Sequence, residues 1–326
     1  MVFDAHADIW TDITHHYLAG ERNIFRKYHY DRLKKGNIEG GIFVIWNDPP
    51  YDEYPLKRTY QMMEAIRQDT KDCADVLKIA CKFEDIDIAK KEEKIYTFIG
   101  LEGLKSIGKN IDLIDEFYNF GIRHMGLTWN EQNDLATGVK GEISRGITNL
   151  GKKAVKKIQD KGILLDTSHL NDKSFWDLMR IATGPVVATH SNCRELCNNM
   201  RNLSDEQLKV IADSGGIVGV NAFNQFISEE IDKQNINVLI EHLIHMIEIM
   251  GIEHVGFGFD FSEFLDLDTL KSFSDQVSPS TKGLEDASKV PVLLDLLKSK
   301  GFSKDEVNKI AFKNWQNVIN KVLKNK

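Results

Sequence analysis

The sequence predicts an α/β protein whose single domain, residues 1–326, is a (β/α)8 or TIM barrel. Eight short apolar runs alternate with segments of helical periodicity, which is typical of parallel strands joined by crossover helices. Several of the runs lead directly into metal-binding residue types, and in a barrel the carboxyl ends of the strands carry the chemistry. An open doubly wound sheet is less favoured, because no glycine-rich phosphate loop follows the first run.

The eight runs are mostly β-branched or aromatic, and they are almost continuously apolar. Such runs are expected where both faces of a strand are buried, as in a parallel sheet. Glycine, proline or polar residues bound them. In chain order, the predicted strands are 2–9, 40–46, 96–101, 122–128, 162–166, 185–189, 216–222 and 254–259.

Segments with apolar residues at helical spacing fill the intervals between the runs. Two of them open with a capping-box pattern, at Ser204 and at Ser303. Helices are predicted at 59–76, 151–161, 204–213, 237–250 and 302–322. The two longest strand-to-helix connections, 129–149 and 261–290, are expected to be binding loops or lids.

Composition limits the partners and the location. The net charge is −7, so an electrostatic nucleic-acid interface is not expected. No run reaches the roughly 18 apolar residues that span a bilayer, and no secretion signal is visible, so a cytoplasmic location without membrane attachment is predicted. The four cysteines have no paired spacing and are expected to be reduced thiols.

Six metal-ligand residue types lie at the ends of five predicted strands. They are His6, Asp8, Glu102, His169, His190 and Asp260. A lone histidine at a strand end is more often structural, but six such residues at the top of one barrel favour a metal site. Three imidazoles and three carboxylates are enough for two divalent ions, which lower the pKa of bound water. A remaining carboxylate can then carry the proton from the nucleophile to the leaving group.

The other histidines are expected to be structural or at the surface. His124 lies inside the fourth predicted strand and is expected to be packed rather than to bind metal. Cys193 and Cys197 follow a candidate metal histidine, but a packing role is favoured, because water-activating sites prefer nitrogen and oxygen donors. The remaining histidines are His15, His16, His29, His242, His245 and His254.

The order of these motifs resembles the membrane dipeptidase (renal dipeptidase) family of metal-dependent amidohydrolases, from residue 2 to residue 320. Each motif alone is weakly specific, whereas the set is highly specific. The motifs are Asp4-Ala5-His6-Ala7-Asp8, Gly100-Leu101-Glu102-Gly103, Gly121-Ile122-Arg123 with Leu127-Thr128, Leu165-Asp166-Thr167-Ser168-His169, Thr189-His190-Ser191-Asn192, Arg201-Asn202 and Val255-Gly256-Phe257-Gly258-Phe259-Asp260-Phe261.

The resemblance implies a binuclear site that holds two zinc ions per chain. His6 and Asp8 would hold one ion together with Glu102, which would bridge to the second ion. His169 and His190 would hold that second ion. Dimers are common among resembling proteins, so the resemblance also allows a homodimer.

The resemblance also implies the roles of the residues that meet the substrate. Asp260 would be the general acid and base and would also touch a metal ion, so Asp260 and Glu102 are the candidate catalytic residues. Arg201 matches the arginine that grips the substrate carboxylate, a role that suits the forked donors of a guanidinium group.

The sequence departs from the family pattern at Trp129, which stands where other members have a substrate-contacting histidine. An indole cannot accept a proton, but it would narrow the pocket and favour a flat or apolar substrate side chain. Packing beneath the long following loop is the alternative. Two further departures, at Ser262-Glu263 and at Phe312-Lys313, leave the candidate ligands intact.

The resulting hypothesis is a cytoplasmic zinc dipeptidase with a small dipeptide substrate. A hydroxide that bridges the ions would attack the scissile carbonyl, and Asp260 would pass the proton to the leaving amine. The first alternative is a related enzyme that acts on a non-peptide amide, lactone or lactam, which Trp129 favours. The second is a barrel that keeps the fold without catalysis.

Overall fold

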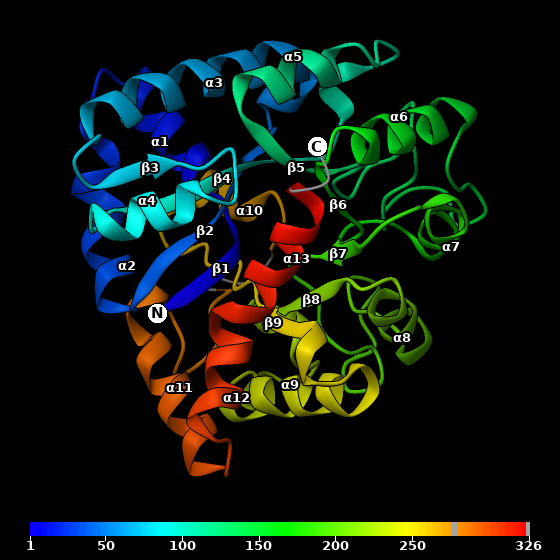
Figure 1. The fold of residues 1–326 in the computed structure, drawn as a ribbon. Helices are drawn as coiled ribbons and strands as arrows, with labels where there is room; N and C mark the ends of the chain where they lie inside the picture. Colours follow the sequence, from blue (N-terminus) through cyan, green and yellow to red (C-terminus); the bar gives the residue numbers. More distant parts are fainter. Residues whose placement is uncertain (275–278, 324–326) are drawn as a thin grey trace.

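Eight parallel strands form the wall of a nearly closed barrel in the computed structural model, which describes residues 1–274 and 279–323 (Figure 1). Each strand pairs in parallel with the next along the wall. The predicted barrel and all eight predicted strands are therefore confirmed. Around the wall the strands are β1 (Val2–Ala7), β2 (Ile38–Trp46), β4 (Ile95–Glu102), β5 (Ile122–Gly126), β6 (Leu164–Asp166), β7 (Val186–Ala188), β8 (Ile217–Val220) and β9 (Val255–Phe257).

A further strand, β3 (Leu77–Ile79), pairs with β4 outside this path and was not predicted. It has three residues and follows α3 after a turn at residues 73–76, so its two apolar side chains give no run that stands out from the preceding helical pattern. It lengthens the sheet beside β4 without entering the barrel wall.

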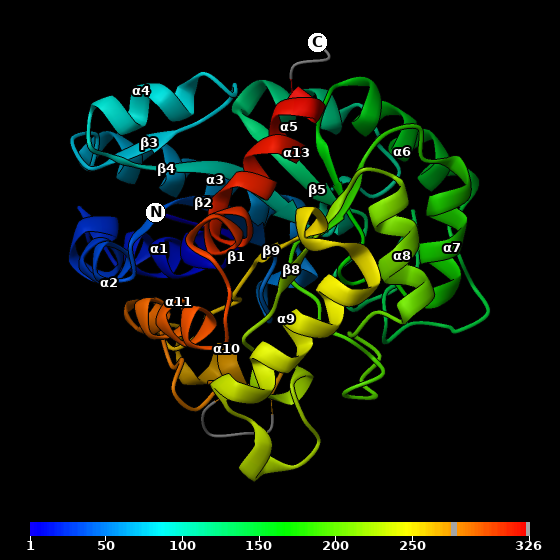
Figure 2. The same cartoon turned by 60° about the horizontal axis from the view of Figure 1, so that its bottom comes forward.

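Helices cover the outside of the barrel, and α6, α7, α8 and α9 follow one another around the later strands (Figure 2). The predicted helices are confirmed, including the capping boxes of Ser204 and Ser303. The predicted helix 302–322 is divided, because a π-helical turn, Lys309–Lys313, separates α12 from α13. The helices are α1 (Ile9–Leu18), α2 (Asp31–Lys35), α3 (Pro55–Asp72), α4 (Asp85–Lys91), α5 (Leu113–Phe120), α6 (Asn149–Asp160), α7 (Asp172–Ile181), α8 (Asp205–Asp213), α9 (Ile236–Met250), α10 (Leu267–Lys271), α11 (Val290–Ser299), α12 (Lys304–Asn308) and α13 (Asn314–Leu323).

The interior of the barrel is a packed core rather than a channel. Phe3 of β1, Phe98 of β4 and Val187 of β7 belong to one buried apolar cluster, which Trp315 of α13 joins. The Trp315 ring lies 6.0 Å from the Phe3 ring, near the start of β1. α13 therefore closes the amino-terminal end of the barrel (Figure 1), and the opposite, carboxyl end is left for chemistry.

The first and last strands meet at a seam that side-chain and backbone hydrogen bonds hold together. The buried carboxylate of Asp4 accepts a hydrogen bond from the backbone N–H of Phe259, at 2.8 Å. One step further on, the N–H of Asp260 donates to the carbonyl of His6, at 3.3 Å. Both bonds lie next to candidate ligands. The seam therefore holds the candidate ligands near the start of the chain against the one near its end.

The two predicted long loops lie at the carboxyl end of the barrel. The first follows β5 and runs to Thr148 without a helix of its own. The second follows β9 and contains the short helix α10. Residues 275–278 of that second loop lie outside the described residues.

Candidate active site

The structure brings together the side chains of all six predicted metal ligands at the carboxyl end of the barrel. Glu102 is the last residue of β4, and the other five lie in or just after β1, β6, β7 and β9. In each of two groups, the potential ligand atoms all lie within 4.8 Å of one another. The first group is His6, Glu102 and His190, and the second is His6, Asp8 and Asp260. The donor atoms of the barrel top therefore converge on one small volume.

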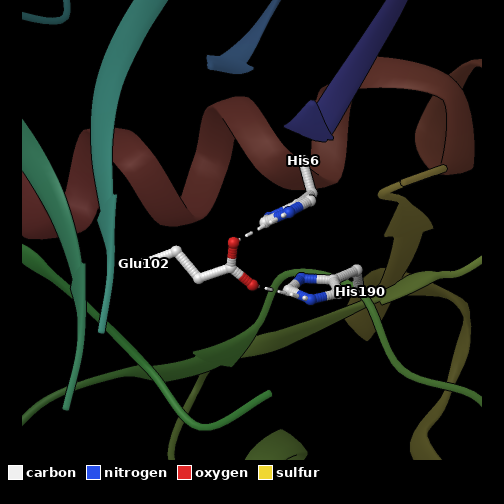
Figure 3. A group of neighbouring side chains, drawn as sticks. All are labelled: His6, Glu102 and His190. Carbon is white, nitrogen blue, oxygen red and sulfur yellow. Dashed lines mark ion pairs between the residues drawn. The ribbon is translucent and has the colours of Figure 1, made fainter. Parts of the chain in front are cut away.

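The carboxylate of Glu102 lies between the imidazoles of His6 and His190 (Figure 3). Its Oε2 atom lies 3.6 Å from Nε2 of His6. Its Oε1 atom lies 2.7 Å from Nε2 of His169 and 3.6 Å from Nε2 of His190. The two oxygens thus face opposite sets of nitrogen donors, which is the arrangement that a bridging carboxylate requires.

The separations on the His6 side fit a shared ion better than direct hydrogen bonds. Nε2 of His6 lies 3.7 Å from Asp8 Oδ2 and 3.7 Å from Asp260 Oδ1, beyond ordinary hydrogen-bond distance. Ligand atoms about 2.1 Å from a tetrahedral ion lie roughly 3.4 Å apart. In addition, His6 Nδ1 and Asp8 Oδ1 are buried and lack a hydrogen-bond partner, so the donor set fits a bound cation.

The second pair of imidazoles fits a cation for a different reason. Nε2 of His169 and Nε2 of His190 lie 2.9 Å apart. Nδ1 of His169 faces Asn130 Oδ1 at 2.9 Å, and Nδ1 of His190 faces the Thr189 hydroxyl at 2.8 Å. These partners place a proton on each Nδ1 and leave a lone pair on each Nε2. Two buried lone pairs at this distance repel unless a cation lies between or beside them.

A buried carboxylate, Asp166, supports the His190 side of the site. The Thr189 hydroxyl donates a hydrogen bond to Asp166 Oδ2 and therefore accepts its hydrogen bond from His190. Asp166 also accepts from the Ser168 hydroxyl at 2.7 Å and from Nε2 of His124 at 2.8 Å. Burial alone would raise the pKa of Asp166, but the hydrogen bonds and the charge of His124 lower it overall. Asp166 stays ionised and fixes the ring of His190 through Thr189.

Three carboxyl groups share one buried pocket, where burial and like charge disfavour their ionised forms. Burial raises the pKa of Glu102, and so do the nearby carboxylates Asp8 and Asp260. Burial likewise raises the pKa of Asp260, with Asp8 adding to the effect. Burial would lower the pKa of His6, but the carboxylates of Glu102, Asp260 and Asp8 raise it to about 10. Three carboxylates in one buried volume call for positive charge beside them.

Asp260 is held in an unusual backbone conformation at the seam. Its φ angle is 60°, in the left-handed region that residues other than glycine rarely adopt. Asn221, just after β8, donates from Nδ2 to Asp260 Oδ2 at 3.0 Å. This contact leaves Oδ1 facing His6, so one oxygen is anchored while the other points into the donor cluster. Backbone strain of this kind is typical of functional positions.

Arg201 lies at the edge of the cluster with its guanidinium group buried. It donates to the carbonyls of Ser168 and His190, and its Nη2 atom lies 3.2 Å from Nε2 of His169. Within residues 1–274 and 279–323 it makes no ion pair with a carboxylate, and its Nε atom has no partner. Burial lowers the pKa of Arg201 to about 10, against the raising effect of Asp260 and Glu102. The group therefore stays charged and has donor capacity to spare.

A cavity of about 400 Å3 lies above the donor cluster, within the size range of small-molecule sites. Its wall includes Asp8, Glu102, His169, Asp260 and Arg201. Trp129, half-buried, also lines it, with its ring 6.2 Å from the ring of His169. Both candidate substrate-binding residues thus face the same space as the candidate ligands.

Several residues that shape the site were not singled out from the sequence. Asn130, Thr189 and Asn221 each hold a candidate ligand or catalytic side chain. Asp166 and Thr189 stand inside the quoted motifs, within three residues of a candidate ligand, and that position was the available signal. Asn221 is the penultimate residue of the predicted strand 216–222, which could have marked it in the same way as the six ligands.

The residues expected to be structural are packed. His124 is buried and pairs with Asp166 rather than with the donor cluster. Cys193 is buried, and its thiol donates to the carbonyl of His242. Burial raises the pKa of Cys193 and of Cys197, so both thiols stay protonated and neither is poised to bind metal.

Comparison with known proteins agrees with the fold. The model of the membrane dipeptidase family, peptidase family M19, matches residues 1–326. An uncharacterised protein of the pqqA 5' region of Klebsiella pneumoniae is 31% identical over 278 residues, which cover 82% of this chain and 97% of that protein.

Two solved structures share the fold over almost the whole chain. Dipeptidase AC, a metallopeptidase of family M19, has a TM-score of 0.86 and 25% identity, covering 99% of this chain and 98% of its own. A metallopeptidase from Rhodobacter sphaeroides, liganded with a phosphinate mimic of the dipeptide L-Ala-D-Ala, has a TM-score of 0.86 and 23% identity, covering 98% of this chain and 99% of its own.

The barrel, with histidines and carboxylates gathered at its carboxyl end, defines a metallopeptidase, an enzyme that hydrolyses peptide bonds with the help of metal ions. More particularly, the chain belongs to the membrane dipeptidase family, M19. Among the described residues, no helix combines the length and the apolar character that crossing a bilayer requires.

Proposed function

We propose that this enzyme is a zinc-dependent dipeptidase that uses two ions per chain. The observation that carries the proposal is the position of Glu102, with one carboxylate oxygen facing His6 and the other facing His169 and His190. His6, Asp8 and Glu102 would hold one ion, and Glu102, His169 and His190 the other. Nitrogen and oxygen donors in this mixture suit zinc.

When bound, two such ions lower the pKa of water and polarise the scissile carbonyl. The protein groups perform the remaining tasks. Asp260 takes a proton from the attacking water and delivers it to the leaving amine. Its buried position raises its pKa, which suits a group that must both accept and release a proton. The hydrogen bond from Asn221 to Oδ2 of Asp260 holds the carboxylate in place while Oδ1 transfers the proton.

Arg201 would bind the carboxylate of the substrate's carboxyl-terminal residue. Its guanidinium group is buried, charged and free of any carboxylate partner in the part of the chain that the structure describes. A charge-assisted pair formed in such a buried place is strong and directional. Because Arg201 lies beside His169, a carboxylate bound to it would lie close to the candidate ligands, which favours short peptides as substrates.

The cytoplasmic location expected from the sequence is part of the same proposal, and the four free cysteines suit a reducing compartment. A homodimer also stays a prediction, which sedimentation velocity of the purified chain would test.

The test is a hydrolysis assay on the zinc-reconstituted chain. L,L- and L,D-dipeptides would be offered beside tripeptides, lactones and lactams at equal concentration. We expect release of free amino acids from dipeptides and little turnover of the other classes. Preferential turnover of a lactone or lactam would overturn the dipeptidase proposal and establish the alternative chemistry instead.

A further inference from the structure

Aromatic side chains form a continuous arc along the wall of the cavity. The ring of Trp129 lies 5.2 Å from that of Trp46, and Trp46 lies 5.8 Å from Phe273. Phe273 lies 5.9 Å from Phe223, which lies 4.8 Å from Phe226. We call these five residues the aromatic collar. All five line the cavity above the candidate metal ligands.

The collar begins beside Glu102 and ends at Arg201. Trp46 is the register partner of Glu102 across the β2–β4 pair. Gly103, with a φ angle of 81°, lets the backbone of Trp129 approach, since a Cβ there would lie 2.7 Å from the Trp129 nitrogen. At the other end, the guanidinium group of Arg201 lies over the ring of Phe226, 5.4 Å from its centre.

The strand order sets the two ends of a substrate on opposite sides of the barrel. β2, which carries Trp46, lies four strands from β7 in either direction around the eight-stranded wall, and Arg201 lies in the connection that follows β7. If Arg201 binds the terminal carboxylate and the scissile bond lies over Glu102, the amino-terminal residue of the substrate extends toward Trp46 and Trp129. This step rests on the proposed dipeptidase function.

The chemistry of that side is apolar. Trp46, Trp129 and Phe273 carry no charge, and Trp46 is buried while the other two are half-buried. Aromatic rings offer large, rigid contact areas, and they favour other rings in offset or edge-on geometry. A carboxylate placed among them would lose its hydration without gaining a partner, and a lysine ammonium group would recover only part of its hydration through cation–π contact.

We propose that the part of the aromatic collar that begins beside Glu102 is the specificity pocket for the amino-terminal residue of the substrate and selects a large apolar, above all aromatic, side chain. Trp46, Trp129 and Phe273 are its specificity-determining residues. The enzyme thus prefers dipeptides of the form aromatic–Xaa over those that begin with alanine or lysine.

The test uses the zinc-reconstituted full chain and four substrates that differ only in the first residue: L-Phe-Gly, L-Leu-Gly, L-Ala-Gly and L-Lys-Gly. We expect kcat/KM for L-Phe-Gly to exceed that for L-Ala-Gly by about 100-fold, the scale on which apolar pockets discriminate. Phe273→Ala and Trp46→Leu should each reduce this ratio to about 10-fold or less.

Trp176→Leu provides the matched control. Trp176 is a partly buried aromatic residue on α7 that packs against Phe175 and does not line the cavity. Its variant should keep the parent ratio. The proposal is overturned if the parent shows no preference, or if the ratio survives in both collar variants. If the parent hydrolyses none of the four dipeptides, the dipeptidase function itself fails and this inference fails with it.

Discussion

Nε2 of His169 and Nε2 of His190 face each other at 2.9 Å, while the other nitrogen of each ring is already engaged in a hydrogen bond. With a proton on each Nδ1, each Nε2 turns a lone pair toward the other, and Nη2 of Arg201 lies 3.2 Å from Nε2 of His169. The guanidinium group offsets part of the repulsion between the two lone pairs. A metal ion bound by both rings would satisfy both lone pairs, so the arrangement suits a metal site.

We expect the purified chain to bind two zinc ions after reconstitution. Glu102→Gln should reduce the content to about one ion or less, because one neutral amide replaces the carboxylate that faces both donor sets. Elemental analysis of the dialysed protein measures this directly. A parent content of one ion per chain would refute the binuclear arrangement, and full retention by Glu102→Gln would refute the bridging role.

Thr189→Val should weaken zinc binding on the His190 side by about 10- to 100-fold, the usual effect of losing a partner that orients a metal ligand. The valine keeps the shape of threonine but breaks the link from His190 to Asp166. Competition with a chromophoric chelator gives the affinity. Thr189→Ser retains the hydroxyl and should bind zinc as the parent does. Equal weakening in both variants would mean that packing, not the hydrogen bond, is responsible.

Asp260→Asn should retain most of its zinc and slow dipeptide hydrolysis by about 100-fold or more, since the amide cannot carry the proton. Asparagine tolerates the left-handed backbone conformation of this residue, so folding should be preserved. Metal content and kcat are measured on the same sample. Turnover at the parent rate would exclude Asp260 as the acid and base, whereas loss of metal would identify it mainly as a ligand.

Amidation of the substrate's carboxyl terminus should lower kcat/KM by about 10- to 150-fold, equivalent to about 1.5–3 kcal/mol for a hydrogen bond to a charged group. In Arg201→Ala the free and amidated substrates should be hydrolysed at similar, low rates. The comparison requires only the two substrates and the two proteins. An unchanged ratio in Arg201→Ala would show that another group recognises the carboxylate.

We expect the free energy of unfolding to fall in mild acid because the buried side chain of His242 resists protonation. Burial lowers the pKa of His242 to about 4, against the raising effect of the hydrogen bond to the carbonyl of Ile227. The neutral ring accepts from the N–H of Cys193 and donates to that carbonyl. The unfolded chain binds this proton near pH 6.5, so the free energy of unfolding decreases as the pH drops from about 6.5 toward 4.

The expected loss from His242 is about 2–3 kcal/mol at pH 4.5 relative to pH 7. Glutamine offers a comparable donor and acceptor but does not titrate. The free energy of unfolding of His242→Gln should therefore fall by about 2–3 kcal/mol less than that of the parent between pH 7 and pH 4.5. The midpoints of urea unfolding, measured for both proteins at pH 4.5 and at pH 7, test this expectation. Parallel losses in parent and variant would assign the acid sensitivity to other groups.

The sequence predicts the barrel well because its strands are buried on both faces. Continuous apolar runs marked all eight strands of the wall, and the strand ends located the six donor residues. β3 escaped because three residues after a helix make no such run. The π-helical turn before α13 also left no mark, since its residues keep a helical apolar pattern.

The parts of the site that depend on pairing between distant elements were not predictable in this way. Trp46 ended a predicted strand, but only the fold places it beside Trp129 and Phe273. The link from Asp166 through Thr189 to His190 joins neighbouring strands whose residues are 23 apart in the chain. The residue types of such networks are visible in a sequence, whereas their partners are set by register and packing.

The hydrogen bonds across the seam make the site a late product of chain synthesis. Asp4 and Phe259 are 255 positions apart, so a nascent chain carries His6 and Asp8 long before the residues that hold them in place have been made. Loss of the seam would part Asp260 from His6 while most of the other strand pairs remained intact. Enzymatic activity should accordingly report on completion of the whole barrel and disappear at the first, local opening of its wall.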